Sequence, residues 1–163
     1  MLRFSKLLKR LHDNEVQFIV IGGVAVNLLG AQVGTFDLDV CAPLDDDNLQ
    51  KLIRALRGLK PRWRFRPDKI FPFNSVKRFS GYKNIYLDTN WGPLDILGDL
   101  PGVGTFEQIR DETVEMDVGG FTCRVLNLNT LIKAKTAAGR DKDKFALQHL
   151  EEIRRMNLAE GEP

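Results

Sequence analysis

The sequence predicts an α/β protein of the α+β type, with a mixed β-sheet flanked by helices and a pair of helices at the C-terminal end. Short, β-branched apolar runs alternate with amphipathic stretches through the first part of the chain, and two consecutive helical patterns close it. With 163 residues, 43% of them hydrophobic, the chain can bury the core of one domain but is too short for two of ordinary size. We therefore expect one domain over residues 1–157 and a disordered tail over residues 158–163.

Helices and short strands are expected to alternate in the first part of the chain. Leucines and Phe4 recur at helical spacing among basic residues, which predicts a helix that ends near Asp13-Asn14. The elements expected next are a buried strand at 16–21, a short helix at 24–30, a strand at 36–42 and a helix at 44–59. The last of these has an acidic first turn and a basic last turn, which the helix dipole favours.

Strands are expected to dominate the middle of the chain and helices its end. The expected order is strands at 63–66, 84–89 and 93–98, a short helix at 105–112, a hairpin at 114–126, and helices at 127–139 and 143–156. Asn127 is a suitable N-cap for the first of the closing helices, and Gly139 is a suitable C-cap.

Charge and cysteine content exclude few classes of protein. A net charge of +2 identifies no partner by itself. Cys41 and Cys123 lie far apart in apolar, strand-like contexts, which predicts buried thiols and favours a reducing compartment. No apolar run approaches the length that crosses a bilayer, so we expect a cytoplasmic protein with no membrane partner.

Two aspartates stand one residue apart in an apolar run. Alternate residues of a strand share a face, so Asp37 and Asp39 are expected to project together. The apolar residues around them, Phe36, Leu38 and Val40, are expected to pack on the opposite side. Neighbouring carboxylates repel each other unless a cation lies between them, and oxygen ligands suit Mg²⁺ or Mn²⁺. The pattern predicts a metal site; the competing interpretation is a solvated face on an edge strand.

A third carboxylate would complete a site for a pair of metal ions. Asp95 is an isolated acid in the apolar strand expected at 93–98, and Asp88 has a similar position in the strand before it. A hairpin around Asn90-Trp91-Gly92 would place either of them beside the first pair. We favour Asp95, with Asp88 as the competitor.

Gly22-Gly23 lies where the first strand is expected to turn into a short helix. Glycine lets a phosphate approach the backbone closely, and the N–H groups and dipole of the helix then face the phosphate. The spacing differs from that of the dinucleotide-binding motif, and a Walker lysine is absent. A tight strand-to-helix connection would also explain the glycines.

The order of these motifs resembles the polymerase-β-like nucleotidyltransferase superfamily. In that superfamily an apolar residue and Gly-Gly or Gly-Ser precede a short helix and a strand with Asp-x-Asp or Asp-x-Glu; here Ile21-Gly22-Gly23 precedes Asp37-Leu38-Asp39. The segments "LDILGDLPGVGTFEQI" and "VLNLNTLIKAKTAAGRDKD" resemble small bacterial and archaeal nucleotidyltransferases related to AbiEii-type abortive-infection toxins. The likeness covers residues 18–143.

The resemblance implies a nucleotidyltransferase fold and metal-dependent transfer of a nucleoside monophosphate from a nucleoside triphosphate (NTP) to a hydroxyl group. It implies that Asp37, Asp39 and Asp95 hold Mg²⁺ or Mn²⁺ and that Asp95 helps to deprotonate the attacking hydroxyl. The nucleotide-binding residues that it implies are Gly22, Gly23, Thr35, Lys135 and Arg140. Lys135 and Arg140 would equally complement a helix dipole.

Two positions depart from the pattern of the family. Val33 stands four residues before Asp37, where relatives often carry an arginine. Ala146 stands three residues after Asp143, where many relatives carry a second aspartate. These departures leave open a catalytically degenerate module that binds a partner or a nucleotide without turnover.

The segment 51–83 is strongly basic and carries Asp68 as its single acid. Arginines alternate with aromatic residues from Arg62 to Arg66, so a strand there would present a cationic face suited to an RNA backbone, with rings available for base stacking. RNA, including a tRNA end, is then the expected acceptor. If the rings are core and the cations only solvated, a small hydroxylated molecule or a protein side chain is the alternative. The resemblance also implies a cognate antitoxin or partner protein, as in toxin–antitoxin or defence systems.

Overall fold

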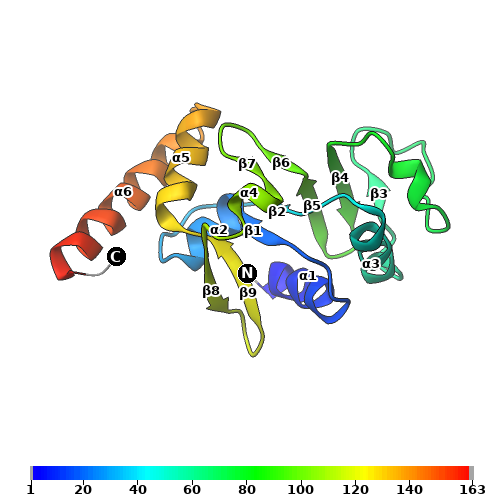
Figure 1. Ribbon diagram of the computed structural model, residues 1–163, viewed down its shortest axis with the longest axis horizontal. Helices are drawn as coiled ribbons and strands as arrows, with labels where there is room; N and C mark the ends of the chain where they lie inside the picture. Colours follow the sequence, from blue (N-terminus) through cyan, green and yellow to red (C-terminus); the bar gives the residue numbers. More distant parts are fainter. Residues whose placement is uncertain (1, 162–163) are drawn as a thin grey trace.

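A mixed β-sheet forms the middle of the molecule in this computed structural model, which describes residues 2–161 (Figure 1). Its strands are β1 (Ile19–Ile21), β2 (Leu38–Cys41), β3 (Arg62–Trp63), β4 (Asn84–Thr89), β5 (Gly92–Leu97), β8 (Thr113–Asp117) and β9 (Thr122–Leu126). The seven strands lie in the order β3-β4-β5-β2-β1-β9-β8, with parallel pairs β2–β5 and β1–β9. A separate pair consists of β6 (Asp99–Leu100) and β7 (Gly104–Thr105).

Helices flank this sheet, as the sequence predicted. They are α1 (Leu2–Asp13), α2 (Gly22–Leu28), α3 (Asp46–Leu56), α4 (Phe106–Ile109), α5 (Leu128–Ala138) and α6 (Asp143–Glu160), with a 3₁₀ helix, η1 (Val76–Phe79). Helices α1 and α3 lie side by side against one face of the sheet (Figure 1). Arg10 of α1 donates hydrogen bonds to the carbonyls of Ala55 at 2.8 Å and Arg57 at 2.7 Å, which fixes α1 against the end of α3.

Hydrophobic burial sets the orientation of the central strands. Leu38 and Val40 of β2 and Leu94 of β5 are fully buried, and each such side chain contributes roughly 1.5–3 kcal/mol. Strand alternation then directs Asp39 and Asp95 to the opposite face. A slip of one residue would bury the carboxylates and expose the apolar side chains, so the register is strongly specified.

The central strands are shorter than predicted. β1 contains only Ile19–Ile21: the residues before it form a loop, and α2 begins directly after it at Gly22. The last residue of β1, Ile21, pairs with Asp39, so β1 offers no partner to the residues that precede β2. Phe36 lies outside the strand and is 89% exposed, and the prediction that it packs beneath the aspartates is wrong.

The predicted strand at 63–66 is also wrong, because β3 contains only Arg62 and Trp63. The N–H of Arg66 returns to the carbonyl of Trp63 at 3.4 Å, and Pro67 follows, so the chain turns away from the sheet. The alternating cationic face expected there does not form. Several of the rings pack together instead: Trp63 stacks on Tyr82 with centroids 5.3 Å apart, and Phe79 is buried against both.

The C-terminal helical pair is confirmed, together with both predicted caps of α5. The side chain of Asn127 accepts a hydrogen bond from the N–H of Thr130 at 2.9 Å, and Gly139 ends the helix with φ of 60°. α6 continues to Glu160, so the predicted tail is helical over residues 158–160. The end of that predicted tail, residues 162–163, lies outside the described residues.

A buried ion-pair cluster joins α5 to α6. The Nζ of Lys135 lies 2.8 Å from Asp143 Oδ1, and the Nε of Arg140 lies 2.6 Å from Asp143 Oδ2. The side chains of Lys135 and Asp143 are 9% and 4% exposed. Burial by itself would raise the pKa of Asp143, but the hydrogen bonds and charges of Arg140 and Lys135 outweigh it and hold that pKa below its usual value.

Both cysteines are buried and unpaired, as predicted. Burial raises the pKa of each thiol to about 12, so neither supplies a thiolate at neutral pH. Across residues 2–161, the structure contains no helix whose length and apolar character would let it cross a membrane.

Removing Asp143 should destabilise the protein strongly. Asp143→Ala leaves the Lys135 ammonium buried without its partner, a change that typically costs about 3–5 kcal/mol. Asp141→Ala is the matched control, because Asp141 is 93% exposed and its pair with Lys144 is worth at most about 1 kcal/mol. Urea unfolding of the two variants measures the difference; equal free energies of unfolding would contradict a structural role for the cluster.

Candidate active site

The carboxylates of Asp39 and Asp95 lie side by side on the sheet. Asp39 of β2 is the register partner of Asp95 of β5, and these strands are parallel neighbours. With Asp37, each residue offers a carboxylate oxygen, and these three oxygens all lie within 4.8 Å of one another. The structure therefore brings together the three carboxylates that the sequence singled out, with Asp95 as the third.

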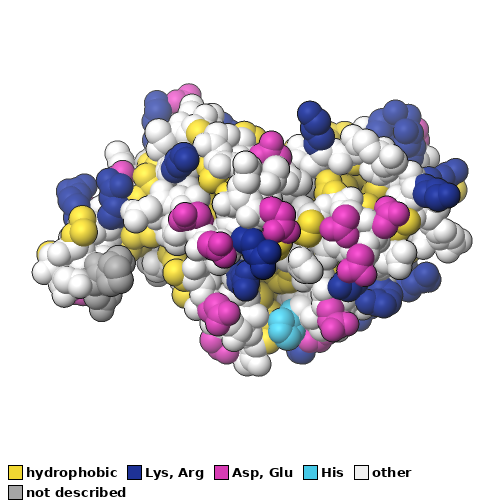
Figure 2. All heavy atoms as spheres, viewed as in Figure 1, with side chains coloured by type: hydrophobic (Ala, Val, Ile, Leu, Met, Phe, Trp, Pro, Cys, Tyr) yellow, Lys and Arg dark blue, Asp and Glu magenta, His cyan; other side chains and the backbone are white. Residues whose placement is uncertain are grey.

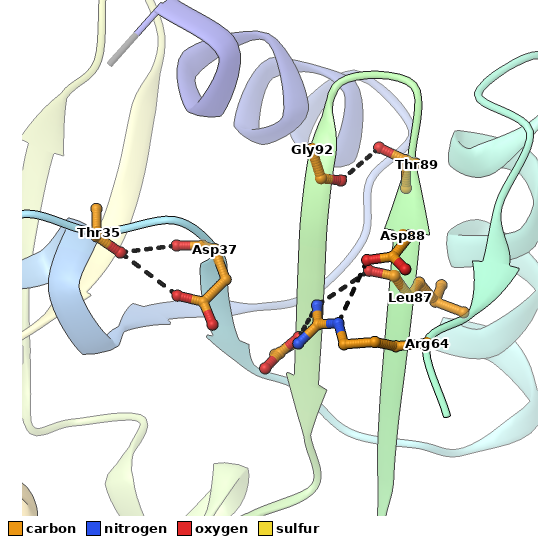
Figure 3. Close-up of polar contacts among 8 residues, drawn as sticks. Thr35, Asp37, Arg64, Leu87, Asp88, Thr89 and Gly92 are labelled. Carbon is orange, nitrogen blue, oxygen red and sulfur yellow. Dashed lines mark hydrogen bonds and ion pairs between the residues drawn. The ribbon is translucent and has the colours of Figure 1, made fainter. Parts of the chain in front are cut away.

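Asp37 precedes β2 and is held by a turn rather than by the sheet. The Thr35 hydroxyl donates a hydrogen bond to the carbonyl oxygen of Asp37 at 3.0 Å and lies 3.5 Å from its Oδ1 (Figure 3). Thr35 thus orients the carboxylate that the strand itself does not reach. The sequence predicted a nucleotide contact for this hydroxyl, and that contact stays a prediction beside the turn that the structure shows.

Crowding of like charges perturbs the cluster. Burial, followed by the charges of Asp37 and Asp95, raises the pKa of Asp39 to about 7, although the positive charges of Arg140 and Lys135 partly oppose the rise. Burial also raises the pKa of Asp95, and Arg64 opposes it. The carboxylates are therefore gathered at a cost in free energy that a bound cation would relieve.

Gly22 and Gly23 are the first residues of α2, and each makes a close approach that a side chain would prevent. A Cβ on Gly22, whose φ is +65°, would lie 2.1 Å from Asp39 Oδ2. A Cβ on Gly23 would lie 2.7 Å from the Oγ1 of Thr35. The glycines therefore let the start of α2 pack directly on the side chains that form the carboxylate cluster.

A cleft of about 320 Å³ opens beside the cluster. Gly22 and Asp39 line one side of it, and Lys135 and Arg140, from the end of α5 and the turn after it, line another. The Lys135 ammonium is buried and engaged with Asp143, whereas the Arg140 side chain is 55% exposed. The structure thus places both predicted cations at the cleft, with Arg140 the more accessible.

Asp88, the competitor for the third carboxylate, is not part of the cluster that the described residues form. Its Oδ1 lies 3.3 Å from the Nε of Arg64, whose Nη2 lies 2.5 Å from Asp95 Oδ1 and donates to the carbonyl of Leu87 at 3.1 Å (Figure 3). Sequence reasoning missed Arg64 as a site residue, because it counted the arginine only within the basic segment. The register of β3 on β4, where Arg62 pairs with Asp88, brings Arg64 near Asp95, and this register is visible only in the structure.

The two positions that depart from the resemblance both take part in the fold. Val33 exchanges backbone hydrogen bonds with the Asn27 side chain, at 2.7 and 3.0 Å, which fixes the loop before the aspartates. Ala146 is buried on α6, so that position packs against the core.

Comparison with known proteins identifies the fold. No protein-family model and no curated protein matches the sequence. Among solved structures, the lincomycin-bound crystal structure of the lincosamide antibiotic adenylyltransferase LnuA matches with a TM-score of 0.63 and 18% sequence identity. The match covers 93% of this chain and 96% of that chain. The predicted nucleotidyltransferase fold is thus confirmed across nearly the whole chain.

The residues present fit a hard divalent cation. Carboxylate oxygens are the ligands that Mg²⁺ and Mn²⁺ prefer, and three of them converge here within 4.8 Å. Burial raises the pKa of Asp39, and the charges of Asp37 and Asp95 raise it further, so a cation among the three would stabilise their ionised forms. The donor set and its charge both suit such an ion.

Gly22→Ala should lower the free energy of unfolding and disturb the carboxylate cluster by more than the backbone strain of the substitution accounts for. Gly139→Ala is the matched control, because Gly139 also has a positive φ, of +60°. The atom nearest to a Cβ added there would be 3.9 Å away, so this variant has the backbone strain without a clash. Both variants should lose about 1–2 kcal/mol from the left-handed conformation. Gly22→Ala should lose about 1–3 kcal/mol more, because Asp39 must move. Urea unfolding and Mn²⁺ titration check this, and equal behaviour of the two variants would contradict it.

Asp39→Asn should stabilise the metal-free protein at high pH. Because the pKa of Asp39 is raised from 3.8 to about 7, its ionisation lowers the free energy of unfolding as pH rises, and the full penalty is present above pH 7. Removing it should add roughly 2–4 kcal/mol at pH 8 in EDTA and much less at pH 5. Thermal unfolding at both pH values measures the gain. Asp111→Asn, at an exposed position, should leave the stability unchanged at both pH values. An effect of Asp39→Asn that does not depend on pH would contradict the raised pKa of Asp39.

Proposed function

We propose that this protein is a metal-dependent nucleotidyltransferase that transfers a nucleoside monophosphate from an NTP to a hydroxyl acceptor. The observation that carries the proposal is the convergence of Asp37, Asp39 and Asp95 on one face of a sheet whose fold is shared with an adenylyltransferase. The cleft beside them has a largely apolar lining, to which Gly22, Lys135 and Arg140 add groups that suit a phosphate.

The three aspartates share one role in the proposed mechanism, and Asp95 has a second. Asp37, Asp39 and Asp95 would together hold Mg²⁺ or Mn²⁺, and Asp95 would also help to remove the proton of the acceptor hydroxyl group. The metal would neutralise charge on the phosphates and on the attacking and leaving oxygens during an in-line displacement at the α-phosphorus. Because Arg64 contacts Asp95 Oδ1 in the structure, Asp95 Oδ2 is the oxygen left for these roles.

The remaining predicted residues bind the nucleotide in this proposal. The backbone at Gly22 and Gly23 receives the phosphates, and Thr35 supports it by packing on Gly23. Arg140, the exposed cation at the cleft, neutralises the departing pyrophosphate, as cations do in phosphoryl transfer. Lys135 acts indirectly in this proposal. Its positive charge lowers the pKa of Asp39, and its ion pair holds Asp143, whose carboxylate also orients Arg140.

RNA, including a tRNA end, is the acceptor we propose first. Lys and Arg side chains gather at the end of the molecule that carries α3, β3 and the segment 64–83 (Figure 2). Phe65 and Tyr82 expose 71% and 40% of their surface there, and Phe65 contacts Tyr86, which lines the cleft. Exposed rings beside cations suit single-stranded nucleic acid. Because β3 ends at Trp63, the cations lie on the loop that follows it and form no regular face.

A small hydroxylated molecule is the second candidate acceptor, and the lincomycin bound to LnuA supports this class. A toxin or defence role with a cognate antitoxin or other partner protein rests only on the resemblance of residues 94–143 to AbiEii-related proteins. Val33 and Ala146 keep the degenerate binding module as the alternative to an enzyme.

One labelling experiment tests the proposal and separates the acceptors. The protein is incubated with each α-labelled NTP and Mg²⁺ or Mn²⁺, with total RNA or with lincomycin, and label is followed into each acceptor. Asp37→Asn and Asp95→Asn should each lower transfer by about 10³-fold, since losing a metal ligand removes several kcal/mol of transition-state stabilisation. Asp111→Asn should not. Nucleotide binding without transfer to any acceptor would support the degenerate module and contradict the enzyme.

A further inference from the structure

We propose that Arg64, held in place by Asp88, is a positioning residue that fixes Asp95 with one oxygen free for the metal. This inference rests on the metal-binding part of the proposed function and is independent of the nucleotide and acceptor. The observation behind it is that one guanidinium spans β4 and β5 at the edge of the carboxylate cluster (Figure 3).

Arg64 is anchored before it reaches Asp95. Its backbone N–H donates to the carbonyl of Tyr86 at 3.0 Å, just beyond the last residue of β3. Its Nε lies 3.3 Å from Asp88 Oδ1, and its Nη2 donates to the carbonyl of Leu87 at 3.1 Å. The side chain is 22% exposed. One backbone contact and two guanidinium contacts to β4 hold Arg64 against that strand, so the sheet directs its approach to Asp95.

The contact to Asp95 settles which oxygen remains available. Nη2 of Arg64 lies 2.5 Å from Asp95 Oδ1, and that oxygen is buried with no well-aligned hydrogen bond from the described residues. The ion pair therefore compensates the burial of Oδ1 and stops the carboxylate from rotating. Oδ2 is then the oxygen free to join Asp37 and Asp39, which makes Asp95 a ligand through a single oxygen.

Charge balance favours the same role. The cluster holds three carboxylates, and Asp88 adds a fourth negative charge nearby. Arg64 contacts both Asp88 and Asp95, so its single positive charge offsets charge on both. Mutation of a residue that holds a metal-binding carboxylate in this way commonly lowers metal affinity by about 10–100-fold.

A lysine can replace the charge of Arg64 but not its shape. The planar guanidinium reaches Asp88 through Nε and both Leu87 and Asp95 through Nη2, whereas an ammonium is a single point charge on a flexible stem. Arg64→Lys should therefore restore part of what Arg64→Met loses. That partial rescue separates positioning from a general effect on stability.

The test uses Mn²⁺ alone, titrated into the full chain and followed through the electron paramagnetic resonance signal of the free ion. Arg64→Met should weaken Mn²⁺ binding by about 10–100-fold, and Arg64→Lys should recover part of the loss. Asp88→Asn weakens one contact that holds the Arg64 side chain but keeps the guanidinium, so it should weaken Mn²⁺ binding less than Arg64→Met does. Arg110→Met, which removes an exposed guanidinium paired with Glu107, is the control and should bind Mn²⁺ like the parent.

The outcomes distinguish the inference from the proposed function. If the parent binds Mn²⁺ and Arg64→Met binds it equally or more tightly, Arg64 does not position Asp95 and the inference is overturned while the metal site stands. If the parent binds no Mn²⁺, the metal site fails and the inference fails with it. Should Arg64→Met not fold, Asp88→Asn and Arg64→Lys decide, and unchanged Mn²⁺ affinity in both would overturn the inference.

Discussion

The register between β2 and β5 is the constraint on which the candidate site depends. Leu38 and Val40 must be buried beneath the sheet, and so must Leu94 on the parallel neighbour, so Asp39 and Asp95 are forced to the opposite face as direct partners. The apolar burial that stabilises the sheet is therefore also what gathers the like charges. β1 adds the final element, because it ends beside Asp39 and turns into α2 at Gly22 with no side chain in the way.

Gathering carboxylates in this way destabilises the metal-free protein, and the surrounding elements limit the cost. The pKa of Asp39 rises to about 7 because burial and two neighbouring carboxylates oppose its ionisation. Cations approach the cluster from both sides: Arg64 from the end of β3, and Arg140 with Lys135 from the C-terminal helices. None of the three is a free surface charge, since Arg64 pairs with Asp88 and the other two pair with Asp143. The C-terminal pair is thus part of the site's electrostatics as well as of the fold.

Local patterns predicted much of the fold and the core of the site. The helices at either end, the hairpin and the mixed sheet follow from periodicity and from capping residues such as Asn127. Two predictions were wrong for local reasons: Phe36 lies before β2 begins, and β3 ends at Trp63 because the chain turns away at Arg66 and Pro67, although β4 still has residues 84–86 beyond the last pair. Arg64 was missed because the basic segment around it hid a contact to a residue 31 positions away.

The sequence by itself determined the element types, the glycine step at Gly22-Gly23 and the identity of the carboxylates, because these depend on neighbouring residues and on side-chain chemistry. Three outcomes were decided only by the tertiary structure. Asp95 and not Asp88 joins the carboxylate cluster, Lys135 is buried in an ion pair with Asp143, and Arg64 contacts Asp95. Those outcomes depend on which strands pair and on which charged side chains are buried beside each other. Strand pairing and desolvation are properties of the assembled sheet, and no short stretch of the chain contains them.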